Sequence, residues 1–390
     1  MRLIKSALTL IFAIIISQFS ITPTFAAPDD GYPAGSAAPG RTCPQTPVGE
    51  KTVSSYSGKT LVCTNIQGSK KWWIENEPIP SAPTTPQVEN STPPVIPHTY
   101  SLPEKSLVKM KVIKNIPYAT ISATQKLDIY LPKEVKNPPL VIWLHGGGFM
   151  FLDKSVVLFD EGAKMLEALT SNGIGVAAID YRLATEAKFP AAAQDTKSAI
   201  RFLRANSDKY GFDSKKLAVL GESSGAYLAV MAGISENQKS VFDDTSDKNL
   251  ATSAALSAVI EISGNANYRT MASNIAKYPC KANVGKKIQA MDNPWFGSES
   301  TPGVAEKIDS ANLYPLLKTN KNLPSFFIVH GTEDCFVSPR DSIELDKTIK
   351  SLGGKSTLTL IKGGTHGGKT VWDAAIKLAP TLKEFFSKVK

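Results

Sequence analysis

Histidine and cysteine are both scarce in this sequence, with four of each among 390 residues. The cysteines form no Cys-x-x-Cys pair and have no neighbouring histidine, so the sequence predicts no metal site. No cluster of basic and aromatic residues resembles a nucleic-acid-binding module. With 42% hydrophobic and 20% charged residues, the composition is typical of a globular protein with a sizeable core.

The sequence also lacks a convincing transmembrane segment. Its longest apolar run, "ALTLIFAIII", is shorter than the roughly 20 residues that span a membrane. Arg2 and Lys5 precede this run, and the small-residue site Thr24-Phe25-Ala26 follows it, which is the order of a secretory signal peptide. We therefore expect residues 1–26 to direct export, so that the mature protein is secreted or associated with the cell surface. An uncleaved membrane anchor is the alternative.

Export to an oxidising compartment favours disulfides between the few cysteines. Cys43 and Cys63 lie close together near the N-terminus, and Cys280 and Cys335 lie far beyond them. Of the three possible pairings, 43–63 with 280–335 keeps each bridge inside one candidate module. Closing the roughly 20-residue loop between the first two would stabilise a very small module by about 3 kcal/mol.

The N-terminal third predicts a small module followed by a linker. Residues 27–77 include the alternating stretches "KTVSSY" and "KTLVCTN", which flank Ser57-Gly58 and predict a β-hairpin. The tandem Trp72 and Trp73 either bind a cell-wall polysaccharide surface or form the core of this unit. Residues 78–104 are rich in proline, which is typical of an extended spacer. The formal charge of +9 favours binding to anionic cell-wall or membrane surfaces. The alternative is that it reflects only a solvated, lysine-rich surface.

Residues 105–390 alternate between strand and helix patterns. Eight short apolar runs predict strands at 107–113, 126–132, 140–146, 174–182, 217–223, 258–264, 325–331 and 357–364. Helical periodicity follows at 191–207, 225–234, 340–353 and 372–389. This alternation predicts an α/β fold with a mostly parallel eight-stranded sheet and helices on both faces. We expect the first two strands to pair as an antiparallel edge.

A serine between two glycines marks the end of one predicted strand. Gly221-Glu222-Ser223-Ser224-Gly225 fits the pattern G-x-S-x-G, with a strand before it and a helix after it. In this setting the glycines leave room for a tight turn that exposes the serine hydroxyl at the carboxyl edge of the sheet. Ser223 is therefore the candidate nucleophile.

A serine nucleophile needs a base, and the scarcity of histidine narrows the choice. His98 lies in the proline-rich linker, while His145 and His330 each precede a glycine at a strand end, where a role in the turn is favoured. His366, in "KGGTHGG", follows the last predicted strand, which is where a serine hydrolase of this topology carries its base. Position and elimination both favour His366.

The base in turn needs a carboxylate to orient it. Asp334 follows the penultimate strand and gives the chain order Ser…Asp…His that this fold class uses. Glu333 and Glu261 are the alternatives for the acid. The run His145-Gly146-Gly147-Gly148-Phe149 supplies backbone N–H groups, so Gly147, Gly148 and Ser224 are the candidate oxyanion-hole donors.

Four stretches together resemble a known superfamily: "HGGGF", "DYRLATEAKFPAAAQD", "GESSGAYLA" and "HGTEDCFV" with its later "THG". They are similar to the α/β-hydrolases, and within them to the hormone-sensitive-lipase-like and bacterial feruloyl-esterase-like carboxylesterases. The resemblance covers residues 105–390 and implies the α/β-hydrolase fold. It also implies the same triad and the same oxyanion donors. Many relatives carry Gly-Asp-Ser-Ala-Gly at the turn, where this chain has Glu222 and Ser224.

Two further segments have open roles. Residues 264–323 lie between two core strands and are interpreted as a cap, in which Tyr278, Trp295 and Phe296 either line the acyl pocket or pack in the core. The Asp and Arg of "DYRLA" at 180–184 are expected to lock a loop rather than to bind substrate.

The sequence thus predicts a secreted serine hydrolase that cleaves small carboxylic esters through an acyl-enzyme intermediate, without a metal or an organic cofactor. The first alternative is an amidase or peptidase that uses the same triad. The second is an inert hydrolase domain in a cell-wall-binding protein.

Overall fold

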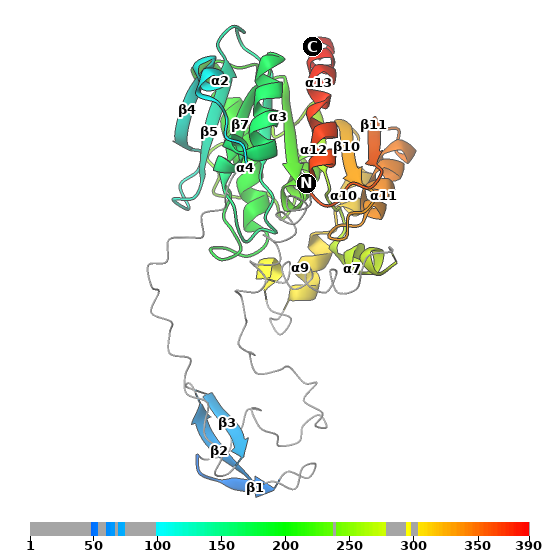
Figure 1. Ribbon diagram of the computed structural model, residues 1–390. Coiled ribbons are helices and arrows are strands. Elements are labelled where there is room, and N and C mark those ends of the chain that lie inside the picture. Colours follow the sequence, from blue (N-terminus) through cyan, green and yellow to red (C-terminus); the bar gives the residue numbers. More distant parts are fainter. Residues whose placement is uncertain are drawn as a thin grey trace. The chain divides into compact units, whose positions relative to one another are not determined.

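The chain forms two compact units, Met1–Pro97 and His98–Lys390 (Figure 1). The computed structural model describes residues 48–53, 60–66, 69–74, 99–236, 239–277, 294–297 and 303–389. The predicted signal peptide, residues 1–26, and Cys43, His98 and Cys280 lie outside these ranges. Within these ranges, no helix has the length and apolarity that a membrane span requires.

The N-terminal unit contains a three-stranded antiparallel sheet of β1 (Lys51–Val53), β2 (Thr60–Ile66) and β3 (Ser69–Ile74). The pairing of β1 with β2 confirms the predicted hairpin. The sequence reading missed β3, which carries Trp72 and Trp73 and pairs with β2. Leu61 and Cys63, at alternate positions of β2, are fully buried. The side chains of the two tryptophans lie outside the described part, so both of their proposed roles stay predictions.

An eight-stranded sheet forms the centre of the larger unit. In spatial order its strands are β11 (Ser356–Ile361), β10 (Ser325–Gly331), β9 (Ala258–Ile262), β8 (Leu217–Glu222), β6 (Leu140–Leu144), β7 (Gly175–Ile179), β5 (Lys126–Pro132) and β4 (Met110–Pro117). The pairs β4–β5 and β5–β7 are antiparallel, and all the other neighbours are parallel. The predicted sheet and its antiparallel edge are therefore confirmed.

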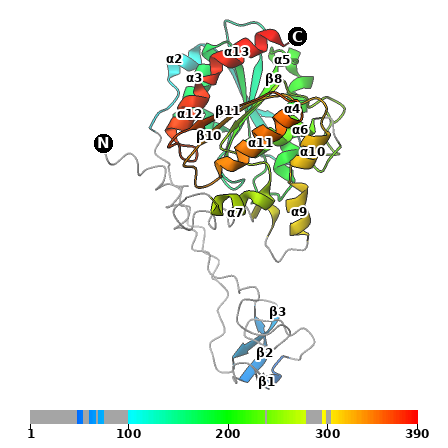
Figure 2. The same cartoon turned by 90° about the vertical axis from the view of Figure 1, so that its right-hand side faces the viewer.

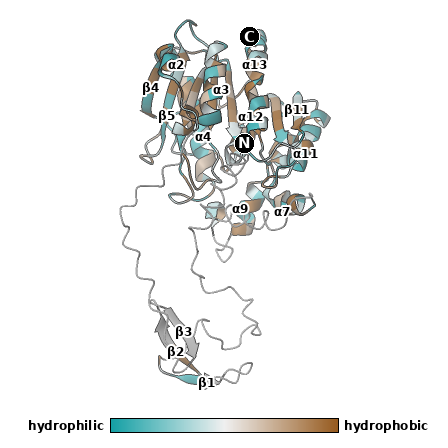
Figure 3. Ribbon diagram, in the orientation of Figure 1, coloured by the Kyte–Doolittle hydropathy of each residue, from teal (hydrophilic) through white to brown (hydrophobic). Residues whose placement is uncertain are grey.

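The central strands β6, β7 and β9 are buried along their whole length, because helices cover both faces of the sheet. Apart from Gly175 and Glu261, all residues of these strands are hydrophobic. In Figure 3, brown, hydrophobic segments lie between the helices of this unit. One face is covered by α3 (Asp160–Ser171), α12 (Lys369–Ile376) and α13 (Leu378–Lys388). The other is covered by α4 (Ala191–Ala205), α6 (Ser224–Ser235), α10 (Tyr314–Thr319) and α11 (Pro339–Ser351), as Figure 2 shows. The shorter helices are α2 (Glu104–Val108), η2 (Lys154–Leu158), α5 (Ser207–Tyr210), α7 (Tyr268–Ala276) and α9 (Val304–Ser310).

Several boundaries differ from the sequence prediction. The first strand begins at Met110, because α2 occupies part of the predicted strand 107–113. The last predicted helix, 372–389, is two helices that divide near Lys377. Pro380 lies in the first turn of α13, where its missing N–H costs no hydrogen bond. Helix α3 was not predicted at all.

The larger unit also begins earlier than residue 105. Thr99 donates its backbone N–H to Asp160 Oδ1 at 2.8 Å, and Leu102 donates to the carbonyl of Leu158 at 2.9 Å. The side chain of Leu102 is buried against the sheet domain. Residues 99–104, which the proline content assigns to the linker, therefore belong to this unit.

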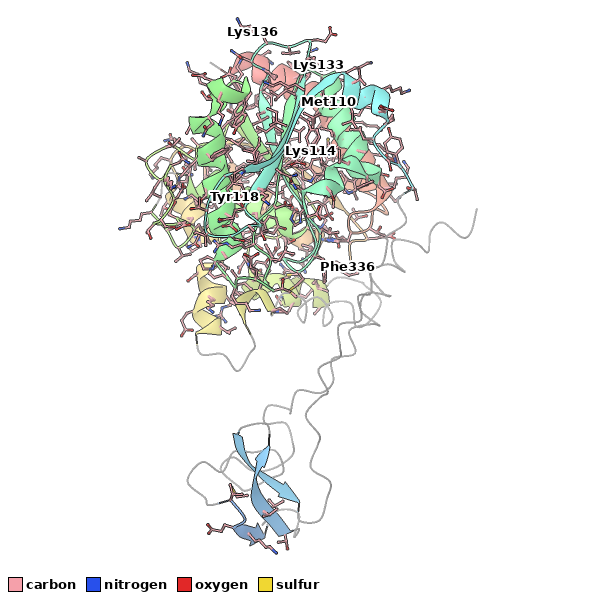
Figure 4. The ribbon with its side chains drawn as sticks, turned by 90° about the vertical axis from the view of Figure 1, so that its left-hand side faces the viewer. Met110, Lys114, Tyr118, Lys133, Lys136 and Phe336 are labelled. Atoms are coloured by element: carbon pink, nitrogen blue, oxygen red, sulfur yellow. The ribbon has the colours of Figure 1, made fainter. Side chains whose placement is uncertain are left out.

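Strand β4 forms one exposed edge of the sheet and faces the viewer in Figure 4, where Met110 and Lys114 mark its course and Tyr118 directly follows its end. Lys114 is exposed, and the pairing with β5 is irregular between Ile113 and Ile116. Asn115 within that bulge has a φ of 55°. A charged, bulged edge of this kind discourages pairing with another chain.

Candidate active site

Ser223 lies at the sharp turn between β8 and α6. Its φ of 55° and ψ of −121° are strained for a residue with a side chain. A Cβ on Gly221 would lie 2.0 Å from the carbonyl oxygen of Gly225, and a Cβ on Gly225 would lie 2.2 Å from that of Leu144. Both glycines are therefore required for the turn to close. The Ser223 N–H donates to Ile262 O at 3.0 Å, which ties the turn to β9.

The structure brings Ser223, His366 and Asp334 together from three separate loops. His366 Nε2 lies 2.9 Å from Ser223 Oγ, and His366 Nδ1 lies 2.7 Å from Asp334 Oδ2. Each loop follows the carboxyl end of a parallel strand, and these ends share one edge of the sheet. The three residues stand in the geometry of a nucleophile, a base and an orienting acid.

Asp334 is fully buried and held from several sides. Its Oδ1 accepts hydrogen bonds from the backbone N–H groups of Phe336 at 2.8 Å and Val337 at 2.9 Å. Burial alone would raise the pKa of this carboxyl, but His366 and His330 more than offset that effect and lower the pKa below its usual value. Asp334 is therefore ionised throughout the neutral range.

His330 is a member of this network that the sequence analysis assigned only to a turn. It is fully buried, and its Nε2 lies 3.2 Å from Asp334 Oδ2, the same oxygen that His366 contacts. Its Nδ1 lies 2.7 Å from Ser342 Oγ, and this hydroxyl donates in turn to Glu261 Oε2 at 3.1 Å. Burial lowers the pKa of His330, but Asp334 and Glu261 outweigh it, and the pKa is raised.

The two alternative acids are placed elsewhere. Glu261 is buried beside His330 and Ser342 rather than beside His366. Glu333 is exposed on the surface of its loop. Among the described carboxylates, only Asp334 reaches His366 Nδ1.

The candidate oxyanion loop follows β6. Gly147 and Gly148 have φ values of 99° and 59°, which a residue with a side chain rarely adopts. A Cβ on Gly147 would also lie 2.4 Å from the carbonyl oxygen of Phe151. Within the described part of the chain, the N–H groups of Gly147, Gly148 and Ser224 donate to no protein acceptor. These three donors therefore remain free to bind a substrate oxygen.

His145, which precedes this loop, is buried and stacked on Tyr181, with ring centroids 4.2 Å apart. Burial lowers the pKa of His145 to about 4, so the ring is neutral at neutral pH. The Tyr181 hydroxyl donates to the carbonyl of His145 at 2.7 Å. His145 thus has the structural role that the sequence favoured.

The "DYRLA" segment is locked by ion pairs. Arg182 pairs with buried Asp195 at 2.7 Å, and Asp180 pairs with Lys154 at 3.1 Å. This agrees with the prediction that the segment fixes a loop.

The segment between β9 and β10 packs against both the acid loop and the oxyanion loop. Met271 and Ile275 of α7 contact Val337, and Asn274 donates to Asp341 of α11 at 2.9 Å. Trp295 is fully buried and stacks on Phe149 with ring centroids 3.8 Å apart. Phe296 is also buried, so for these two residues the core role applies. Tyr278 lies outside the described residues.

Two further observations concern ligands. Neither Cys63 nor Cys335 is a free thiol, while the pairing 43–63 and 280–335 stays a prediction because the other two cysteines are not described. In the described ranges, no group of three His, Cys, Asp or Glu residues is arranged to hold a metal ion.

The strand order, the strained serine turn and the chain order Ser–Asp–His after β8, β10 and β11 define the α/β-hydrolase fold. Comparison with protein families agrees with this class. The BD-FAE family model matches residues 127–349, more than half of the chain, and the protein belongs to the BD-FAE family.

Curated relatives include esterases. Esterase LipC of Mycobacterium tuberculosis is 24% identical over 62% of this chain and 57% of its own length. A probable isoprenylcysteine alpha-carbonyl methylesterase of Oryza sativa is 25% identical over 66% of this chain and 58% of its own length. The chain thus spans less than two thirds of the length of these relatives.

Solved structures support the fold. A truncated carbohydrate esterase from gut microbiota superposes with a TM-score of 0.63 at 24% identity, covering 74% of this chain and 100% of that structure. Esterase B from Lactobacillus Rhamnosis gives a TM-score of 0.56 at 19% identity, covering 72% of this chain and 88% of that one.

Proposed function

We propose that the protein is a serine carboxylesterase that uses Ser223, His366 and Asp334. The observation that carries this proposal is the continuous hydrogen-bonded path from Ser223 Oγ through His366 to Asp334, with distances of 2.9 and 2.7 Å. Esterase relatives and membership of the BD-FAE family support the same activity.

In the proposed reaction, His366 Nε2 takes the proton of Ser223 as Oγ attacks the ester carbonyl. Ionised Asp334 stabilises the imidazolium that forms, and the N–H groups of Gly147, Gly148 and Ser224 bind the developing oxyanion. His366 then gives its proton to the leaving alcohol. Water, activated by the same imidazole, hydrolyses the acyl-enzyme and restores Ser223.

We further propose that residues 1–26 direct export and that the small N-terminal unit binds a polysaccharide surface. The basic start, the short apolar run and the small-residue site support export. The similarity to a truncated carbohydrate esterase from gut microbiota supports esters of sugars as substrates to be tested.

The test is hydrolysis of p-nitrophenyl acetate, butyrate and octanoate by the mature protein, beside Ser223→Ala and His366→Ala. Both variants should lose about 10⁴-fold or more in kcat/KM, because the triad acts as a unit. Ser387→Ala, an exposed serine of α13, is the matched control and should keep full activity.

Labelling with a fluorophosphonate distinguishes the alternatives. Labelled Ser223 with ester turnover supports the esterase. Labelled Ser223 that turns over anilides but not esters would instead support an amidase. A protein that is neither labelled nor active would refute the proposal and favour an inert hydrolase domain.

A further inference from the structure

Glu222, the variable residue of the Gly-Glu-Ser-Ser-Gly turn, is unused by the triad but lies beside it. It is the last residue of β8, directly before the nucleophile. Its Oε1 lies 3.9 Å from His366 Nε2, the same nitrogen that faces Ser223 Oγ. The active site therefore contains a second carboxylate, on the side of His366 opposite to Asp334.

The neighbouring loops make room for this carboxylate. A Cβ on Gly146 would lie 2.3 Å from Glu222 Oε2, and a Cβ on Gly367 would lie 2.7 Å from its Oε1. Gly146 does not have a positive φ, so the backbone conformation does not demand glycine there. Space for the Glu222 carboxylate, and for its backbone carbonyl at 3.1 Å, accounts for this glycine.

No structural partner uses up the hydrogen-bonding capacity of Glu222. Among the described residues, no N–H or O–H group donates to its carboxylate, and no Lys or Arg pairs with it. Its side chain keeps 20% of its surface exposed, although the catalytic Asp334 has none. Carboxylates in this position that serve the fold are normally paired. An open carboxylate beside the reacting atoms is a group that substrate or water can reach.

The position of the Glu222 carboxylate relative to His366 determines which part of a bound substrate it can contact. In an acyl transfer, His366 Nε2 returns its proton to the oxygen of the leaving alcohol, so that alcohol lies against Nε2. The Oε1 atom of Glu222 borders the same place. A hydroxyl on the carbon adjacent to the one that carries the ester oxygen would lie within hydrogen-bonding range of this carboxylate.

We propose that Glu222 selects the alcohol portion of the substrate by accepting a hydrogen bond from a hydroxyl adjacent to the ester. The preferred substrates are then partial esters of polyols and sugars rather than esters of simple alkyl alcohols. This inference rests on the proposed esterase function and assigns its substrate class. A hydrogen bond to a charged acceptor is worth more than one between neutral groups, which makes the preference measurable.

The titratable groups that interact electrostatically with Glu222 are His366, Asp334 and Tyr181. Burial raises the pKa of Glu222, and His366 partly offsets this effect. Because the pKa is raised, the assays are run at pH 8, since a higher pH favours the ionised carboxylate. A purely electrostatic action of Glu222 on His366 would affect every ester equally, which separates it from recognition of the alcohol.

The experiment compares glycerol monobutyrate with propyl butyrate, which share the acyl group and differ in the two free hydroxyls. Butyric acid release gives kcat/KM for wild type, Glu222→Gln and Glu222→Asp, with Glu333→Gln as a control that removes an exposed charge. We expect Glu222→Gln to lower the preference for the glycerol ester by about tenfold. Glu222→Asp keeps the charge but holds it farther from the substrate, so it should lose part of the preference for the glycerol ester. Glu333→Gln should lose none of this preference.

Two results would overturn the proposal. Equal losses on both esters in Glu222→Gln would show that Glu222 acts only through His366, and no loss on either ester would show that Glu222 does not touch the alcohol. In both cases the wild type still hydrolyses esters, so the proposed function survives. A wild type that hydrolyses no ester refutes both together.

Discussion

The strain at Ser223 makes a prediction about stability that does not depend on activity. We compare Ser223→Gly with Ser223→Ala, two variants that both lack the hydroxyl and its hydrogen bond to His366. The loss of that hydrogen bond cancels in the comparison. The two variants differ only in the Cβ, which at a φ of 55° and a ψ of −121° is unfavourable.

The magnitude follows from two opposing effects. Relief of a strained backbone at such a position is worth about 1–3 kcal/mol. Glycine also makes the unfolded chain more flexible, which costs about 0.4–1 kcal/mol relative to alanine. The glycine variant should therefore be the more stable by about 1 kcal/mol, or roughly 2 °C in Tm for a domain of this size.

Equilibrium urea denaturation of both variants measures this difference. Ser387, exposed in helix α13, provides the reference pair, since Ser387→Gly should be less stable than Ser387→Ala. The difference should be smaller than the roughly 1 kcal/mol of a helix interior, because Ser387 is the penultimate residue of the helix. We expect the difference in unfolding free energy between the glycine and alanine variants to have opposite signs at the two sites. If the glycine variant were less stable than the alanine variant at both sites, the turn at Ser223 would not be strained and our account of the nucleophile would fail.

Two further predictions concern the acid loop and its surroundings. Burial raises the pKa of Asp341 to about 7, so its contribution to stability is present below pH 4 and is lost as the pH rises through 7. The variant Asp341→Asn can still accept the hydrogen bond from Asn274. In denaturation curves it should stabilise the protein by about 2–4 kcal/mol at pH 8 and by progressively less toward pH 4. A difference in stability that does not change with pH would contradict this prediction. His330→Gln should lower kcat about tenfold with little change in KM, because it removes one donor from Asp334 and leaves the two backbone donors. A loss as large as that of Asp334→Asn would instead place His330 in the proton path.

The strands and the triad were accessible from the sequence for physical reasons. Strands buried on both faces are uniformly apolar, so their positions can be read from the chain without knowledge of their partners. The triad follows from a local turn pattern, the scarcity of histidine and the fixed chain order of this topology. Ser223 lies directly after β8, and Asp334 and His366 lie in the loops that follow β10 and β11, where sequence position alone determines the edge of the sheet.

The features that the sequence did not indicate depend on contacts between distant segments. His330, near the end of β10, contacts Asp334 in the loop that follows, but its link to Glu261 through Ser342 joins two strands and a helix. The first residues of the larger unit look like linker because prolines precede them, yet tertiary hydrogen bonds hold them. The division between α12 and α13 was missed because the apolar spacing continues through it.

The hydrogen bond from the Ser223 N–H to Ile262 has a consequence for how the site is organised. It extends the hydrogen-bonding pattern of the sheet to the nucleophile itself, and Ser263 repeats the pattern by donating to Val329 at 3.0 Å. The reacting groups are thus ordered when the domain folds, before any ester is present. The entropy of arranging them is lost once for each molecule rather than in each turnover, and the binding free energy of the substrate remains available for the transition state.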